Sequence, residues 1–65
     1  MKAKIFRGKL IRIDDDQLTF VDPEGDEEIY SSEGLDIDEA WAKTYLGSWL
    51  DCTIIDGIVK SIGQP

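Results

Sequence analysis

The sequence contains no histidine, a single cysteine and no apolar run of the roughly 18–20 residues that a membrane-spanning helix needs. Without histidine, the chain lacks the side chain that most often acts as a general base near neutral pH. Its one thiol, Cys52, cannot form a disulfide within the chain, and no histidine can join it in a structural zinc site. The six glycines are dispersed, so no glycine-rich phosphate loop is present. We therefore expect a protein that is not an enzyme and that holds no metal or cofactor.

The length of 65 residues is that of one domain, residues 1–65, with an ordered core over about 3–62. A chain of this size buries only roughly 60% of the surface that its unfolded form exposes, so its core is thin. Hydrophobic residues make up 42% of the sequence, which is close to the globular average. Basic residues interrupt the N-terminal region, so we expect no secretory signal there, and the single unpaired thiol favours a cytoplasmic location.

Charge is distributed unevenly along the chain, which has a formal net charge of −7. Five of the seven basic residues precede residue 13, whereas twelve of the fourteen acidic residues lie between Asp14 and Glu39. An acidic field of this size repels phosphate at long range, so it disfavours nucleic acid as a partner. Most of the basic residues therefore fall on the first expected strand, and most of the acidic residues fall between the end of that strand and the start of the helix.

The first expected strand covers residues 3–13 and contains five large apolar side chains, Ile5, Phe6, Leu10, Ile11 and Ile13. No single alternating face holds all of them. Phe6, or else Ile5, is the candidate inward residue before Gly8, and Ile11 and Ile13 alternate with basic residues after it. A glycine where the pattern changes indicates a bulge or a bend. A bent first strand is what a small closed barrel requires, because that strand pairs in both halves of the sheet.

Two further strands are expected at residues 17–21 and 27–31. In the first of them, Leu18 and Phe20 alternate on one face. In the second, Ile29 is expected to point inward and Tyr30 to point outward or to lie at the rim. Tight turns, including Asp-Pro-Glu-Gly at residues 22–25, join the three strands into a meander.

A short helix is expected over residues 37–46. Asp36 is a suitable N-cap, and Glu39 three residues later completes a capping-box pattern. An apolar stripe at helical spacing should dock on the sheet, and Gly47 should end the helix. The residues of this stripe are Ile37, Ala40, Trp41, Thr44 and Tyr45.

The chain is expected to end in a β-hairpin formed by residues 49–55 and 58–62. Leu50, Cys52 and Ile54 share one face of the first of these strands. The Asp-Gly pair at 56–57 predicts a type I′ turn, which needs positive φ at both central residues. Residues 63–65 are expected to fray.

These elements follow the order β-β-β-α-β-β, which describes a mostly β protein with one helix. The order and the bent first strand interrupted by Gly8 resemble the OB fold, a small five-stranded Greek-key barrel whose helix lies between the third and fourth strands. The resemblance covers nearly the whole chain and concerns topology, with no sequence motif. An SH3-like barrel is the alternative, although the insertion before its last strand is normally shorter.

Carboxylates and the lone thiol are the only candidates for chemistry. Residues 14–16 and 22–28 contain oxygen ligands that Ca²⁺ prefers, but neither segment has the spacing of an EF-hand loop. We interpret both segments as solvated acidic turns. Cys52 falls on an inward face, so it is expected to be a small core residue rather than a nucleophile.

We hypothesise that the protein is a non-catalytic accessory module that binds another protein or a second copy of itself, with no role for a membrane. Trp41 is expected to plug one end of the barrel with Trp49 packed near it. If Trp49 or Tyr30 is exposed instead, it becomes a candidate anchor, because tryptophan and tyrosine dominate interface hot spots.

Two alternatives follow from the fold and from the charge. An OB-type barrel could bind single-stranded nucleic acid through basic and aromatic side chains, here Lys4, Arg7, Lys9, Arg12 and Tyr30. Such basic strand residues more often pair with acidic neighbours across the sheet. Alternatively, the acidic residues 14–16 and 26–28 could mimic nucleic-acid phosphates and occupy the groove of a nucleic-acid-binding protein.

Overall fold

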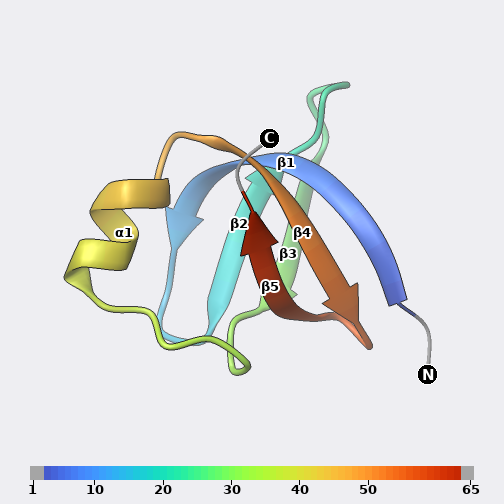
Figure 1. Ribbon diagram of the computed structural model, residues 1–65. Helices are drawn as coiled ribbons and strands as arrows, with labels where there is room; N and C mark the ends of the chain where they lie inside the picture. The colour runs from blue at the N-terminus through green and yellow to red at the C-terminus, as the bar shows by residue number, and fades with distance from the viewer. Residues whose placement is uncertain (1–2, 64–65) are drawn as a thin grey trace.

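Five strands form a closed barrel in the computed structural model of the protein, which describes residues 3–63 (Figure 1). Around the ring the strands follow the order β1-β2-β3-β5-β4, and one short helix lies between β3 and β4 in the chain. The elements are β1 (Ala3–Ile13), β2 (Gln17–Val21), β3 (Glu27–Ser31), α1 (Glu39–Tyr45), β4 (Trp49–Ile55) and β5 (Ile58–Gly63). The predicted element order and the mostly β, barrel-like fold are thus confirmed.

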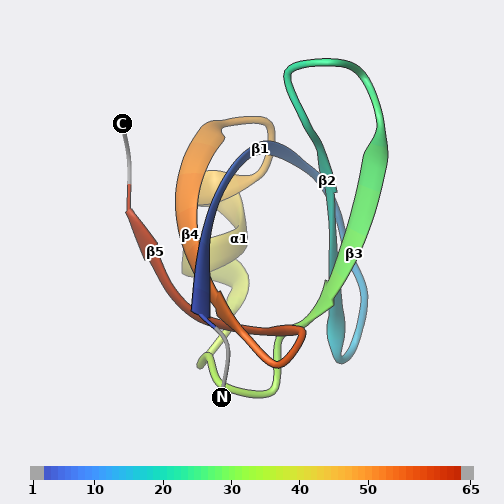
Figure 2. The same cartoon turned by 90° about the vertical axis from the view of Figure 1, so that its right-hand side faces the viewer.

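β1 is a long, bent strand that runs beside β4 and then arches over to run beside β2 (Figure 2). Its first half pairs with β4, from Ala3 opposite Ile55 to Lys9 opposite Trp49, and its second half pairs with β2. This double pairing confirms the expectation from the sequence. At the other seam, β3 and β5 are joined by one parallel pair, Ser31 opposite Ile58.

The irregularity in β1 lies three residues later than expected. Gly8 pairs regularly with Leu50, and the register shifts between Leu10 and Arg12 instead. The extra residue at this bulge reverses which side chains face the core. Leu10, before the bulge, keeps the alternation of Phe6 and is fully buried, whereas Ile11 at the bulge is 41% exposed. Ile13, after the bulge, packs against the core.

A small, aromatic-rich core fills the barrel. Phe6, rather than Ile5, is the inward residue of early β1, and its ring meets Phe20 and Tyr30 edge-on at centroid distances of 5.6 and 5.4 Å. Edge-to-face contacts of this kind add stability beyond the area they bury. The buried apolar residues are Phe6, Leu10, Leu18, Phe20, Tyr30, Leu50, Cys52, Ile54 and Val59.

In β3, the side chains point in the directions opposite to those predicted. Tyr30 is buried, at 8% exposure, and Ile29 is 58% exposed. The register explains this, because Tyr30 lies directly opposite Leu18, and residues opposite one another in an antiparallel pair share a face. Since Leu18 faces the core, Tyr30 must face it too.

The helix is shorter than expected and begins two residues later. Asp38, not Asp36, is the N-cap, and its carboxylate accepts a hydrogen bond of 2.8 Å from the Trp41 amide. Capping at Asp38 leaves Ile37 outside the helix, where it packs against the core before the first turn. Of the predicted stripe, Ile37, Trp41 and Tyr45 contact the core, whereas Ala40 and Thr44 are exposed.

The tight turns have the predicted conformations. Asp56 and Gly57 both have positive φ, at 52° and 77°, as a type I′ turn requires. In the β2–β3 turn, the Asp22 carboxylate accepts hydrogen bonds from the amides of Glu24 and Asp26, both 2.9 Å long. At the C-terminal end, β5 continues through Gly63, which was expected to fray, while residues 64 and 65 lie outside the described part of the chain.

Candidate functional site

A cavity of about 590 Å³ lies where β1 begins and the β4–β5 turn is found. This side of the barrel is away from α1 (Figure 1). Pockets that enclose small ligands have volumes of about 300–1,000 Å³ and combine apolar walls with a few polar groups. This cavity has both kinds of lining. Its residues are Ala3, Lys4, Tyr30, Ile54, Asp56 and Gly57.

Three side chains form a polar network at this cavity. The Lys4 Nζ lies 3.6 Å from Oε1 of Glu28, and the Tyr30 hydroxyl donates a hydrogen bond of 2.6 Å to the same oxygen. The Lys4 ammonium also lies 5.0 Å from the Tyr30 ring centroid and 5.7 Å from that of Phe6. β1 and β3 are not neighbours in the ring, so the network reaches across the end of the barrel.

The surroundings of the network raise the pKa of two of its members, Lys4 and Tyr30. The neighbouring Tyr30 hydroxyl is the largest cause that raises the pKa of Lys4, the Glu28 carboxylate adds to it, and partial burial opposes both. Burial is the largest cause that raises the pKa of Tyr30, and its hydrogen bond to Glu28 adds to that effect. Lys4 is therefore charged and Tyr30 protonated at neutral pH.

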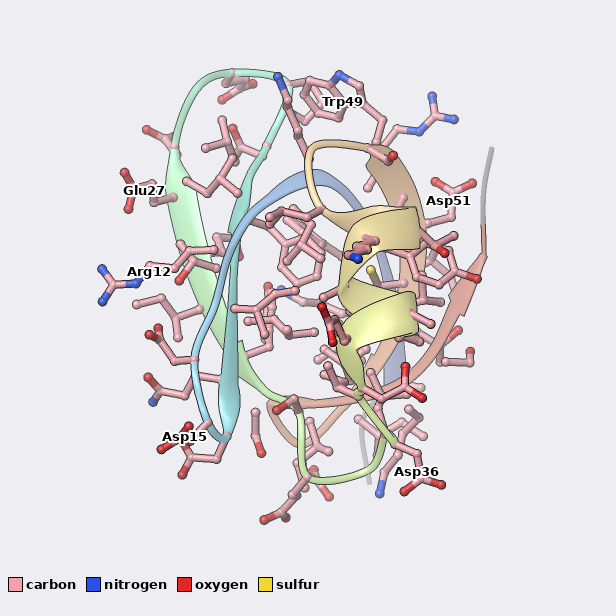
Figure 3. The ribbon with its side chains drawn as sticks, turned by 90° about the vertical axis from the view of Figure 1, so that its left-hand side faces the viewer. Arg12, Asp15, Glu27, Asp36, Trp49 and Asp51 are labelled. Carbon is pink, nitrogen blue, oxygen red and sulfur yellow. The ribbon has the colours of Figure 1, made fainter. Side chains whose placement is uncertain are left out.

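A second candidate site lies on the outer face of β1 and β4, and we call it the Trp49 surface (Arg7, Lys9, Pro23 and Trp49). Trp49 is 42% exposed, although it begins a strand, and it lies opposite Lys9. Arg7, Pro23 and Trp49 line a hollow of about 320 Å³. The Arg7 guanidinium pairs with Asp51 at 3.1 Å, and Figure 3 shows Trp49 and Asp51 on the same end of the protein.

Five of the six predicted contact residues lie at the two sites. Lys4 and Tyr30 meet at the cavity, whereas Arg7, Lys9 and Trp49 meet at the Trp49 surface. Arg12 belongs to neither site, because it lies at the bulge of β1 and pairs with Asp14 at 3.2 Å.

Most of the basic residues on β1 have a carboxylate partner. Lys4, Arg7 and Arg12 form ion pairs with Glu28, Asp51 and Asp14, in that order. Within residues 3–63, Lys9 forms no ion pair. The basic strand therefore presents one unpaired charge beside Trp49 rather than a continuous basic groove.

Sequence reasoning missed the role of Glu28, and its first expectation for Trp49 was wrong, whereas the exposed alternative was right. Glu28 was grouped with the acidic turns, yet it is the residue that joins Lys4 to Tyr30. Trp49 was expected to pack near Trp41, whereas Trp41 contacts Tyr45 at 4.8 Å between ring centroids and Trp49 is exposed. The position of Trp49 directly opposite a lysine of β1 follows from the β1–β4 pairing, which no local pattern predicts.

The acidic turns lie at opposite ends of β2, with Asp15 at one end of the hairpin (Figure 3). Asp22 uses its carboxylate to stabilise its own turn. In the described part of the chain, no three histidine, cysteine, aspartate or glutamate side chains come together as a metal site requires. No helix there is long and apolar enough to cross a bilayer.

Cys52 lies in the core, as predicted, with 1% of its surface exposed. Burial, with a smaller effect from the charge of Asp51, raises its pKa from 9.0 to about 11. The thiolate is the reactive form, and a raised pKa reduces its fraction at any pH below 11. The cytoplasmic location suggested by this lone thiol stays a prediction.

Alkylation of Cys52 by iodoacetamide is therefore expected to be negligible in the native protein at pH 8 and fast in denaturing urea. The folded state lowers both access to the thiol and its thiolate fraction, and unfolding removes both effects. Mass spectrometry of timed samples measures the modified fraction. Equal rates with and without urea would contradict a buried, protonated thiol.

No protein-family model matches the chain, and no curated protein or solved structure matches it.

Proposed function

We propose that the protein is a non-catalytic binding module of the OB type that binds another protein through the Trp49 surface. The OB-type assignment is supported by the helix between β3 and β4 and by a curved β1 that pairs with both β2 and β4. A helical insertion at this point is longer than an SH3-like barrel normally has. The barrel is the scaffold, and the binding site lies on its outer face.

The exposure of Trp49 beside Arg7 is the observation that carries this proposal. Tryptophan and arginine are enriched among the residues that contribute most to protein–protein binding. Trp49 is one of the larger aromatic side chains in the protein, and burying it against a partner removes apolar surface from water. The adjacent hollow offers a place for an apolar side chain of the partner.

Charge defines the chemistry of the partner. Lys9 is unpaired within residues 3–63 and lies opposite Trp49, while Arg7 shares its charge with Asp51. An approaching segment that carries an apolar side chain flanked by a carboxylate would fill the hollow and pair with Lys9. Electrostatic complementarity of this kind adds specificity and speeds association.

Replacing Trp49 with alanine is expected to weaken the partner's binding by about 30-fold, which corresponds to the roughly 2 kcal/mol of a hot-spot residue. A pulldown from the native host, read by mass spectrometry, identifies the partner, and isothermal titration calorimetry with the purified partner measures the affinity. Ile29→Ala is the matched control, because it removes an exposed apolar side chain from another face. An affinity that Trp49→Ala leaves unchanged would refute this surface as the binding site.

Single-stranded nucleic acid is the second candidate partner of the same surface. An exposed aromatic ring beside Arg7 and Lys9 resembles the stacking and phosphate contacts of single-strand binding proteins. The burial of Tyr30 and the net charge of −7 weaken this alternative. It predicts that oligonucleotides are retarded at low salt and released as salt rises, and an absence of retardation at low salt excludes it.

A further inference from the structure

The Lys4 ammonium occupies a site with the composition of a receptor for an organic cation. Two aromatic rings, Tyr30 and Phe6, lie 5.0 and 5.7 Å from Nζ, within the range of about 6 Å over which a ring attracts a cation. The Glu28 carboxylate lies 3.6 Å from Nζ, and the Tyr30 hydroxyl fixes that carboxylate through a hydrogen bond. Cages of aromatic rings recognise ammonium ligands such as choline and methyl-lysine.

The Lys4 side chain can leave this site without disturbing the core. It is 55% exposed, and a lysine side chain is long and flexible. Its ion pair with Glu28 is a partly exposed one, and such pairs contribute little to stability. Tyr30 and Phe6, by contrast, are buried and held by their contact with each other. The cage of Tyr30, Phe6 and Glu28 is thus built on buried rings, whereas the Lys4 side chain that occupies it is 55% exposed.

The cavity beside the cage can hold the rest of a ligand. Ile54 and Ala3 provide apolar wall, and Asp56 lies at the turn, where it forms no ion pair within residues 3–63. The net charge of −7 attracts cations and repels anions at long range. Among residues 3–63, the charged residues that line this cavity are Lys4 and Asp56, and the Glu28 carboxylate lies beside Lys4.

We propose that this cavity binds an aliphatic ammonium compound, whose charged group takes the place of the Lys4 ammonium between Tyr30, Phe6 and Glu28. Lys4 acts as an internal competitor that occupies the cage when no ligand is bound. This site is separate from the Trp49 surface, and the proposal does not depend on the partner bound there.

n-Butylammonium is the direct probe, because it has the same aliphatic chain and charged group as the lysine side chain. It is expected to bind Lys4→Ala about tenfold more tightly than the wild type, since the internal competitor is gone. Two-dimensional NMR titration measures the affinity and should show the largest shifts at Tyr30, Ile54 and Gly57. Adding Glu28→Gln to Lys4→Ala should reverse the gain by about tenfold.

Three controls make the result specific. Lys60→Ala removes the same charge from an exposed position on β5, so it should leave butylammonium binding as weak as in the wild type. Neutral n-butanol and anionic n-butyrate should bind Lys4→Ala much more weakly than butylammonium. Lys4→Met, which keeps an aliphatic stem without the charge, replaces Lys4→Ala if the shorter side chain impairs folding.

Equal binding of butylammonium to Lys4→Ala and Lys60→Ala would overturn the proposal, because the gain would then come from net charge alone. Butanol binding as tight as that of butylammonium would also overturn it, by showing an apolar cavity with no preference for a cation. Choline and a peptide with trimethyllysine, titrated into the wild type, distinguish a free small molecule from a modified protein side chain as the source of the ammonium group.

Discussion

Replacing Phe20 with alanine is expected to lower the free energy of unfolding by about 3–5 kcal/mol, as large-to-small aromatic substitutions in cores do. Phe20 is fully buried and lies 5.6 Å from Phe6 and 6.2 Å from Tyr30, centroid to centroid, so its loss removes the centre of the aromatic cluster. For a chain of 65 residues the whole stability is roughly 3–10 kcal/mol. One substitution therefore removes much of the protein's stability. Urea unfolding followed by circular dichroism measures it.

Two variants serve as comparisons for the loss of stability in Phe20→Ala. Phe20→Leu keeps most of the apolar volume, so it should cost less than Phe20→Ala. Ile29→Ala shortens an exposed side chain on the next strand and should change stability by no more than about 0.5 kcal/mol. If Phe20→Ala and Ile29→Ala unfold at the same urea concentration, the barrel interior is not where this structure places it.

Replacing Gly8 with alanine is expected to lower the free energy of unfolding by about 1–3 kcal/mol, as overpacking of a core does. A Cβ atom at this position would lie 2.6 Å from Cε2 of the Phe6 ring and 3.0 Å from Cβ of Phe20. The ring cannot turn away easily, because Tyr30 packs against it. Thermal unfolding of the variant and the wild type gives the difference.

A double-mutant cycle tests the cause of the Gly8 effect. Phe6→Leu removes the ring atoms nearest to the added methyl group, so Gly8→Ala should cost at least about 0.5 kcal/mol less in that background. Gly63→Ala is the matched control, since its nearest atom would be the Asp51 carbonyl oxygen at 3.9 Å. Equal losses for Gly8→Ala in both backgrounds would show that the Phe6 ring is not the obstacle.

The order of the strands and the helix could be predicted from the sequence, because each element is marked by local sequence signals. The type I′ turn at Asp56 and Gly57 and the Asp22 turn are specified by residues adjacent in the chain, and both have the predicted conformation. Alternation of Leu18 with Phe20 likewise predicted the buried face of β2. These patterns need no information about which strands become neighbours.

The wrong predictions concern which side chains of β1 and β3 point into the core. That choice depends on the register in which each strand pairs with its neighbour. Ile29 and Tyr30 are adjacent apolar residues, so alternation alone allows either to point inward. The Asp22 turn resolves the choice, because it places Glu27 opposite Val21 and hence Tyr30 opposite Leu18. Counting residues from the turn would have placed Tyr30 in the core. In β1, the bulge after Leu10 shifts the facing by one residue, and no glycine or proline marks it.

The candidate sites were predictable only in part. The sequence identified Lys4, Arg7, Lys9 and Trp49 as candidate contacts, but it gave no basis for dividing them between two sites. That division depends on long-range neighbours, since Glu28 reaches Lys4 across the barrel end and Trp49 meets Lys9 through the β1–β4 pairing. Both contacts join residues that are far apart in the chain.

The pairing of β1 with β4 also constrains the order of events during synthesis. Lys9 lies opposite Trp49, so a ribosome must add 40 residues after Lys9 before that pair can form. At about 5–20 residues per second, this takes roughly 2–8 seconds. The meander of β1, β2 and β3 has only tight turns and can assemble within that interval, whereas one edge of β1 stays open. The edge of β1 beside Phe6 therefore has no pairing partner until β4 has been synthesised.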